Sequence, residues 1–112
     1  MRKVVIESPF AGPTEEIRAA NIEYAKACCL DCLRRGETPY ASHLIFPQFL
    51  DDDAPEQRRV GILAGLEWAC TADATVVYTD LGMSKGMQLG IKHAEESGRP
   101  VEYRSLRRGL EG

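Results

Sequence analysis

The sequence lacks any apolar run approaching the roughly 20 residues that a membrane-spanning helix needs. Its basic start is followed by an apolar stretch that ends already at Glu7, which is too short for a secretory signal. Basic charge is not in excess, because 14 Lys and Arg stand against 17 Asp and Glu. A duplex nucleic-acid binder normally carries a basic stripe, and Arg104, Arg107 and Arg108 are interpreted as a solvated end. We therefore expect a cytoplasmic protein with neither a membrane nor duplex nucleic acid as its partner.

Potential metal ligands are few, with four cysteines and two histidines in 112 residues. Cys28 and Cys32 lie one helical turn apart, with Cys29 between them, but a structural zinc site takes four ligands, usually in paired short spacings. The acidic run at 51–53 lacks the alternating ligands of a calcium loop. We expect no metal and no cofactor, and we interpret the clustered thiols as small buried apolar groups, with a redox role left open.

Common catalytic and nucleotide-binding motifs are also missing. The first predicted strand is followed neither by a phosphate loop nor by Gly-x-Gly-x-x-Gly. His43 and His93 do not stand where a Ser-His-Asp arrangement can be assembled from the sequence. Most common nucleotide-dependent enzymes are thereby excluded.

What the sequence does contain is a regular alternation of strand and helix patterns. Short apolar, β-branched runs such as KVVIE and ATVVY alternate with longer segments of helical periodicity. The predicted strands are 3–7, 39–43, 74–78 and 100–103, and the predicted helices are 14–35, from Asp53 to about 70, and 85–97. This order predicts an α/β fold: one Rossmann-like or flavodoxin-like domain spanning 1–112. We expect a four- to five-stranded parallel sheet with helices on both faces.

Several residues predict where helices begin, end and pack. Thr14 is expected to cap the first helix, and Gly36 to follow its end in a left-handed conformation. Asp53 and Glu56 have the spacing of a capping box for the second helix. On that helix Trp68 is interpreted as a core residue. Gly61 and Gly65 form a smooth flank for packing, against either a second copy of the chain or the sheet.

In such sheets ligands bind beyond the carboxyl ends of the strands where the strand order reverses. The two most apolar strands, the first and the third, are expected to flank that crevice. The candidate ligand-binding residues are Ser8, Pro9, Phe10, Gly12, Asn21, His43, Asp80, Gly82, Ser84 and Gly86. The helix start at Ser84 favours phosphate or carboxylate, whereas Asp80 suits a pair of ribose hydroxyls. Phe10 is interpreted either as a stacking residue for a planar ring or as a core plug.

These residues resemble the nucleoside 2-deoxyribosyltransferase-like superfamily, and most of all its small, uncharacterised bacteriophage-type members. The matching positions are Ser8-Pro9-Phe10-x-Gly12, Asn21, Ala25, Pro39-x-Ala41-Ser42-His43, Asp73, Ser84-x-Gly86 and Ala94. The resemblance implies a Rossmann-like sheet with a nucleoside lying over the first strand's turn. It also implies a homodimer or larger homo-oligomer and, if the chain is phage-encoded, a location in the host cytoplasm.

In the transferases a nucleophilic glutamate sits in the third helix, four residues before a small residue. Taking Ala94 as the small residue puts Gly90 at the glutamate position. The resemblance therefore implies binding of a nucleoside- or nucleotide-like small molecule without turnover. Such binding would sequester a host nucleotide immune signal if the protein is phage-encoded. The alternatives are an N-glycosyl hydrolase or transferase that uses Asp80, Glu7 or a carboxylate from a neighbouring subunit, and an interaction protein that has kept the fold.

Overall fold

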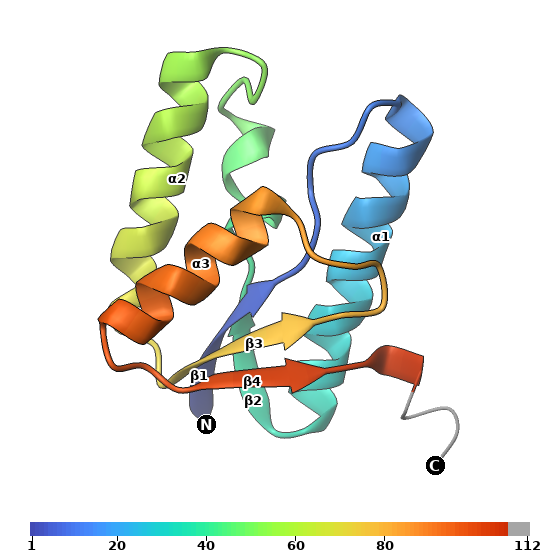
Figure 1. Cartoon of the computed structure of the whole chain (residues 1–112). Coiled ribbons are helices and arrows are strands. Elements are labelled where there is room, and N and C mark those ends of the chain that lie inside the picture. Colours follow the sequence, from blue (N-terminus) through green and yellow to red (C-terminus); the bar gives the residue numbers. More distant parts are fainter. Residues whose placement is uncertain (108–112) are drawn as a thin grey trace.

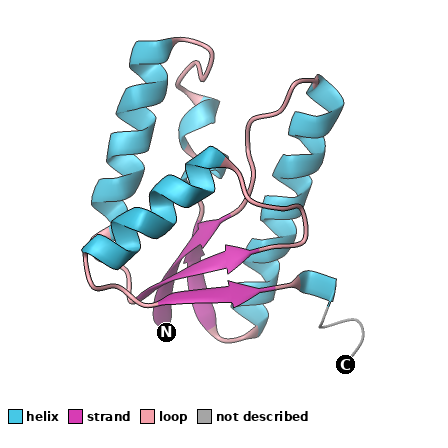
Figure 2. Cartoon of the chain, in the orientation of Figure 1, coloured by secondary structure: helices cyan, strands magenta, loops and turns pink. Residues whose placement is uncertain are grey.

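The structure is a computed structural model, which describes residues 1–107. Strands and helices alternate along this part of the chain, as Figure 2 shows. The elements are β1 (Arg2–Glu7), α1 (Glu15–Arg34), β2 (Glu37–Tyr40), the 3₁₀ turns Ser42–Leu44 and Phe46–Gln48, α2 (Pro55–Ala69), β3 (Ala74–Tyr78), α3 (Lys85–Glu96) and β4 (Val101–Arg104). The α/β fold predicted from the sequence is confirmed.

The four strands form one parallel sheet in the order β2-β1-β3-β4. The first helix, α1, covers one face, and α2 and α3 lie together over the other (Figure 1). The strand order reverses between β1 and β3, which are neighbours in the sheet. Their carboxyl ends are therefore the edge at which a ligand site is expected in an open α/β sheet.

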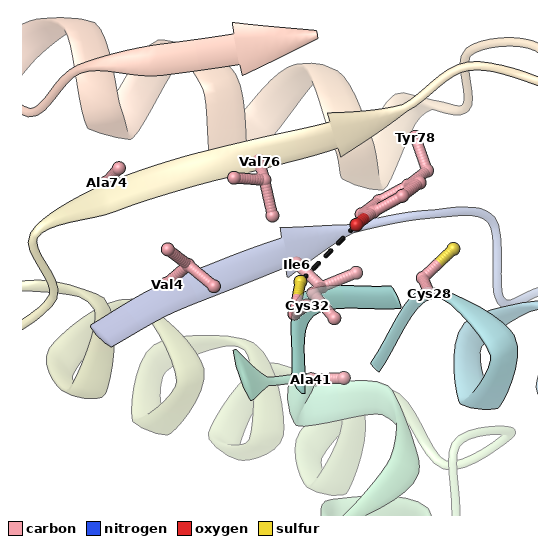
Figure 3. Packing of buried hydrophobic residues seen from close by; sticks show 8 residues of the cluster. All are labelled: Val4, Ile6, Cys28, Cys32, Ala41, Ala74, Val76 and Tyr78. Atoms are coloured by element: carbon pink, nitrogen blue, oxygen red, sulfur yellow. Dashed lines mark hydrogen bonds between the residues drawn. The ribbon is translucent and has the colours of Figure 1, made fainter. Parts of the chain in front are cut away.

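The hydrophobic core fills the space between α1 and the sheet. Since side chains alternate between the two faces of a strand, Val4 and Ile6 point towards α1 whereas Val5 and Glu7 point towards α2 and α3. Figure 3 shows Val4 and Ile6 packed with Val76 and with the fully buried Cys28. Burial raises the pKa of the Cys28 thiol well above its usual range, as expected of an inert core residue.

The helix ends follow the local sequence at most positions. The Thr14 hydroxyl accepts a hydrogen bond from the Ile17 N–H at 3.1 Å, and Gly36 has a φ of 80° just beyond α1, as predicted. The capping box at Asp53 was wrong: Ala54 precedes α2 with no side-chain cap, and Pro55 begins the helix. Proline at the first helical position lacks an N–H, which leaves one donor fewer to satisfy.

Three further sequence predictions need correction. Strand β2 ends at Tyr40, so His43 lies in a 3₁₀ turn rather than in a strand. Trp68 is 60% exposed and stacks on Tyr40 at a ring-centroid distance of 5.5 Å instead of entering the core. Arg104 is not part of a solvated end, because its side chain is 7% exposed and pairs with Glu37. Arg108 lies outside the described residues.

Within residues 1–107 no helix is both long and apolar enough to span a membrane. The same part of the chain contains no cluster of three or more His, Cys, Asp or Glu that could hold a metal ion.

Candidate functional site

A cavity of about 360 Å³ lies on the α2–α3 side of the sheet. Its floor is formed by Val5 and Glu7, the two β1 side chains that alternate away from the α1 core. This volume falls within the range of roughly 300–1,000 Å³ that is typical of small-molecule sites. Most of the lining is apolar, including Phe46, Leu50 and Leu66, and a few polar groups lie among these side chains.

Glycines on both helices keep this space open. Gly61 and Gly65 of α2 and Gly86 and Gly90 of α3 all line the cavity. A Cβ atom at Gly65 would approach the Ser42 Cβ at 3.0 Å, so the α2 flank also packs closely against the turn after β2. The smooth flank of α2 therefore faces the chain's own cavity and gives no support to packing against a second copy.

The carboxyl group of Glu7 occupies the space beside Gly90. A Cβ atom built on Gly90 would overlap both carboxyl oxygens and the carboxyl carbon of Glu7. Glu7 ends β1, and Gly90 lies in the middle of α3, directly above that strand end. The side chain of Glu7 thus reaches the point where any larger residue at position 90 would lie.

Burial makes Glu7 an unusual carboxyl group. Desolvation raises its pKa from 4.5 to about 8, and the positive charge of Arg99 only partly opposes that rise. The Arg99 guanidinium is itself buried, and it donates hydrogen bonds to the Thr75 hydroxyl at 3.0 Å and to the His93 ring at 3.1 Å. Arg99 therefore supplies a positive charge near Glu7 without being neutralised by a carboxylate at either contact.

Ser8 and His43 come together at the same edge of the cavity. The Ser8 Oγ lies 2.8 Å from the His43 Nε2, and the Phe10 ring lies 6.1 Å from the His43 ring. Burial lowers the pKa of His43 to about 4, so the imidazole is neutral at physiological pH. Ser8 and His43 were both predicted to lie at this crevice, but their direct contact was not predicted, because it depends on the 3₁₀ turn after β2 that brings His43 back to the end of β1.

The loop after β1 is held by residues that do not line the cavity. The Asn21 side chain donates hydrogen bonds to the backbone carbonyls of Phe10 at 3.1 Å and Ala11 at 3.4 Å. Arg18 donates to the Gly12 carbonyl at 2.7 Å, and Pro9 is buried. These contacts fix the loop that presents Ser8 and Phe10 to the cavity.

The carboxylate of Asp80 forms hydrogen bonds within the protein and does not line the cavity. Its carboxylate accepts hydrogen bonds from the Tyr24 hydroxyl at 2.6 Å, from the Ser105 hydroxyl, and from the Leu106 N–H at 2.9 Å. Although burial acts to raise its pKa, these hydrogen bonds lower it to about 2. Neither Asp80 nor Gly82 is among the cavity-lining residues.

The start of α3 forms one wall of the cavity mouth. Ser84 caps the helix by accepting a hydrogen bond from the Met87 N–H at 3.2 Å, as predicted. Lys85 and Gly86 line the mouth beside it, and Arg58 of α2 lines the cavity together with Asp52, whose carboxylate lies 4.0 Å from its guanidinium. A negatively charged group on a ligand would be favoured at this end.

The structure thus brings together part of the predicted site. Six of the candidates line the cavity: Glu7, Ser8, Phe10, His43, Ser84 and Gly86. Five others do not: Pro9, Gly12, Asn21, Asp80 and Gly82. Arg99 and the α2 side chains of the lining were not predicted from the sequence. Residue alternation along β1 was the one signal that could have assigned Glu7 to the side opposite the core.

The fold places the chain in a recognisable structural class. A 2-deoxyribosyltransferase from the psychrotolerant bacterium Bacillus psychrosaccharolyticus has a similar structure, with a TM-score of 0.66 and 22% sequence identity. The match covers 92% of this chain and 72% of that one. The protein therefore has the Rossmann-like or flavodoxin-like fold of the nucleoside deoxyribosyltransferases.

The family can be named more closely. The chain belongs to the family described as Domain of unknown function (DUF7768), which matches residues 2–104. No curated protein matches the sequence significantly.

Proposed function

We propose that this protein binds a nucleoside- or nucleotide-derived small molecule in the cavity between α2 and α3. The observation that carries the proposal is the cavity itself, which opens at the β1–β3 switch point and combines an apolar lining with a few polar groups. An apolar wall with Phe10 at its edge suits a planar base, and Glu7, Ser8 and His43 offer hydrogen bonds to a sugar.

The likeness to a 2-deoxyribosyltransferase supports the ligand class, and Lys85 at the N-terminal end of α3 supports a nucleotide. If the chain is phage-encoded, retention of such a ligand would allow it to sequester a host nucleotide signal. An interaction protein without a small-molecule ligand is the less favoured alternative, because it would have no need of this cavity.

The test is a thermal-shift screen of nucleosides, nucleoside 5′-monophosphates and cyclic dinucleotides, with a variant whose cavity is blocked. Gly86 suits the block, because a Cβ there meets nothing closer than the Ser84 Oγ at 3.9 Å. Gly86→Leu should fold and, since glycine costs up to about 1 kcal/mol relative to alanine within a helix, should not lower the melting temperature. It should abolish the ligand shift.

The matched control is Lys92→Leu, which adds the same side chain to the exposed side of α3 and should leave the ligand shift intact. If no compound in the screen shifts the melting temperature of the wild-type protein, the proposed function is wrong. An equal shift in Gly86→Leu would place the ligand elsewhere.

A further inference from the structure

The Glu7 carboxyl stands where the side chain of residue 90 would otherwise begin. The resemblance described from the sequence assigns the reacting carboxylate of the transferases to this helix position, which is Gly90 here. A Cβ on Gly90 would overlap the Glu7 carboxyl, so glycine is required for the observed position of Glu7. The cavity therefore contains a carboxyl group at this point, but β1 rather than α3 supplies it.

The surroundings of Glu7 decide which chemical role this carboxyl can take. Asp80 receives three or more hydrogen bonds, whereas the charge state of Glu7 is governed by desolvation and by Arg99 alone. Near pH 7 the Glu7 carboxyl is consequently protonated, because its pKa is about 8. A protonated carboxyl cannot attack an anomeric carbon, but it can donate a proton to a leaving group.

We propose that Glu7 is a catalytic acid that protonates the leaving base of an N-glycoside bound in the cavity, so that water cleaves the glycosidic bond. The inference rests on the proposed function, since it requires a nucleoside-like ligand in this cavity. It also removes the reason for expecting binding without turnover, which was the missing carboxylate at Gly90.

The step balances with water as the only co-reactant. The Glu7 proton passes to a nitrogen of the base as the C1′–N bond breaks, and the bonding electron pair leaves with the base. Water adds to C1′ and releases one proton to solvent, from which Glu7 is reprotonated. The products are the free base and the sugar with a hydroxyl at C1′. Arg99 stabilises the Glu7 carboxylate that exists between proton donation and reprotonation.

The other charged and titratable groups around the cavity come from each element packed against Glu7. His43 follows β2, Arg58 lies on α2, Lys85 begins α3, Arg99 precedes β4, and Asp52 lies before α2. His43 is neutral over the range in which Glu7 titrates, because its pKa is about 4. A rate that falls as the pH rises through about 8 therefore reports on Glu7.

The experiment measures release of free base from ribonucleosides, 2′-deoxyribonucleosides and their 5′-monophosphates by chromatography. Glu7→Gln keeps the shape and the neutral charge of the protonated carboxyl, so it should fold and retain the ligand-induced thermal shift. It should lower the cleavage rate by about 100- to 10,000-fold, the usual contribution of a general acid. The control Glu95→Gln changes an exposed glutamate of α3 and should cleave at the wild-type rate.

A second substrate separates proton donation from a structural role. The p-nitrophenyl riboside has a leaving group that departs without protonation, so Glu7→Gln should slow its hydrolysis by less than about tenfold. The fall in rate above about pH 8 should be seen with nucleosides and be absent with the nitrophenyl substrate. Equal losses on both substrates would overturn the role of Glu7 as an acid.

A double variant that moves the carboxyl group from β1 to α3 tests whether its position in the cavity, rather than the strand that supplies it, determines the activity. In Glu7→Ala/Gly90→Glu the strand carboxyl is removed and a helix carboxyl takes over the vacated space. This double variant should release base faster than Glu7→Ala alone. A folded, ligand-binding double variant that is no faster would overturn the placement.

The outcomes for the wild-type protein separate this inference from the proposed function. A thermal shift without release of free base from any tested compound overturns the inference and leaves the proposed function standing. The absence of any shift overturns both.

Discussion

At the scale of single residues, Glu7 and Asp80 are the two carboxyl groups that the sequence offered as catalytic candidates. Their environments in the structure are opposite. Glu7 lies in the cavity with a pKa of about 8, and Asp80 is fixed by hydrogen bonds with a pKa of about 2. Burial acts in the same direction on both, so the difference comes from the donors around Asp80. The structure therefore favours Glu7 as the chemically available group.

Replacing Glu7 should change how the stability depends on pH. The folded-state pKa is above the unfolded value of 4.5, so the folded protein holds a proton that the unfolded chain has lost between about pH 4.5 and 8. Stability should therefore decrease as the pH rises through this window, by on the order of 5 kcal/mol in total. Urea unfolding of Glu7→Gln at pH 5 and pH 9 should not show this decrease in unfolding free energy. A wild-type protein equally stable at both pH values would contradict the raised pKa.

Asp80→Asn should have the opposite signature. The folded-state pKa is below the unfolded value, so the carboxylate contributes stability that is present above about pH 4 and lost as the pH falls through about 2. The variant should lose about 1–2 kcal/mol of unfolding free energy at pH 7 and progressively less in acid. Its ligand-induced thermal shift should equal that of the wild type. A lost shift in a folded variant would place Asp80 in the binding site.

At the scale of elements, an ion pair on the α1 side joins the two edge strands. Arg104 of β4 donates hydrogen bonds to both carboxylate oxygens of Glu37 of β2, at 2.7 and 2.8 Å. The two side chains are only 7% and 8% exposed. Glu37 has a second, longer contact with Arg2 at 3.4 Å, so Arg104 supplies the closer of these two ion pairs.

Arg104→Met should therefore lower the unfolding free energy by about 1.5–3 kcal/mol, because the buried Glu37 carboxylate would keep only its longer contact with Arg2. Arg35→Met breaks an exposed pair with Asp31 and should cost no more than about 1 kcal/mol. Urea unfolding of both variants checks the difference. Equal losses would show that the Arg104–Glu37 pair contributes no more than a surface contact.

At the scale of the whole molecule, apolar side chains remain on the outside of α2. Val60, Leu63 and Trp68 are 52%, 53% and 60% exposed. A homo-oligomer, which the family resemblance implies, stays a prediction. The α2 glycines do not support it, since they line the cavity.

If the oligomer covers the outside of α2, the single tryptophan reports on it. Trp68 fluorescence should shift to shorter wavelength as the protein concentration rises, and light scattering should give a multiple of the chain mass. Trp68→Glu should then yield a monomer. The control Leu81→Glu changes an exposed apolar residue outside α2 and should leave the oligomer intact. A monomer at all concentrations in the wild-type protein would contradict the prediction.

Local sequence determined most of the fold of this protein. The β-branched runs gave β1 and β3 almost to the residue, and Thr14, Gly36 and Ser84 marked helix boundaries through their own backbone and side-chain chemistry. Such features depend on neighbours along the chain, so they can be read without tertiary contacts. The predicted capping box at Asp53 was wrong, because α2 begins at Pro55 after Ala54, without a side-chain cap.

The site was decided by packing between segments distant in the sequence. Nothing near Glu7 indicates that Gly90 lies above it, and nothing near Ser8 indicates that His43 returns to it. Likewise, Asp80 looked available until the chain after β4 supplied its hydrogen-bond donors. The sequence by itself predicted the parallel sheet and, as a hypothesis, a ligand-binding edge between β1 and β3. Only the tertiary structure decided which carboxyl faces that edge, because desolvation and hydrogen bonding depend on what packs around each side chain.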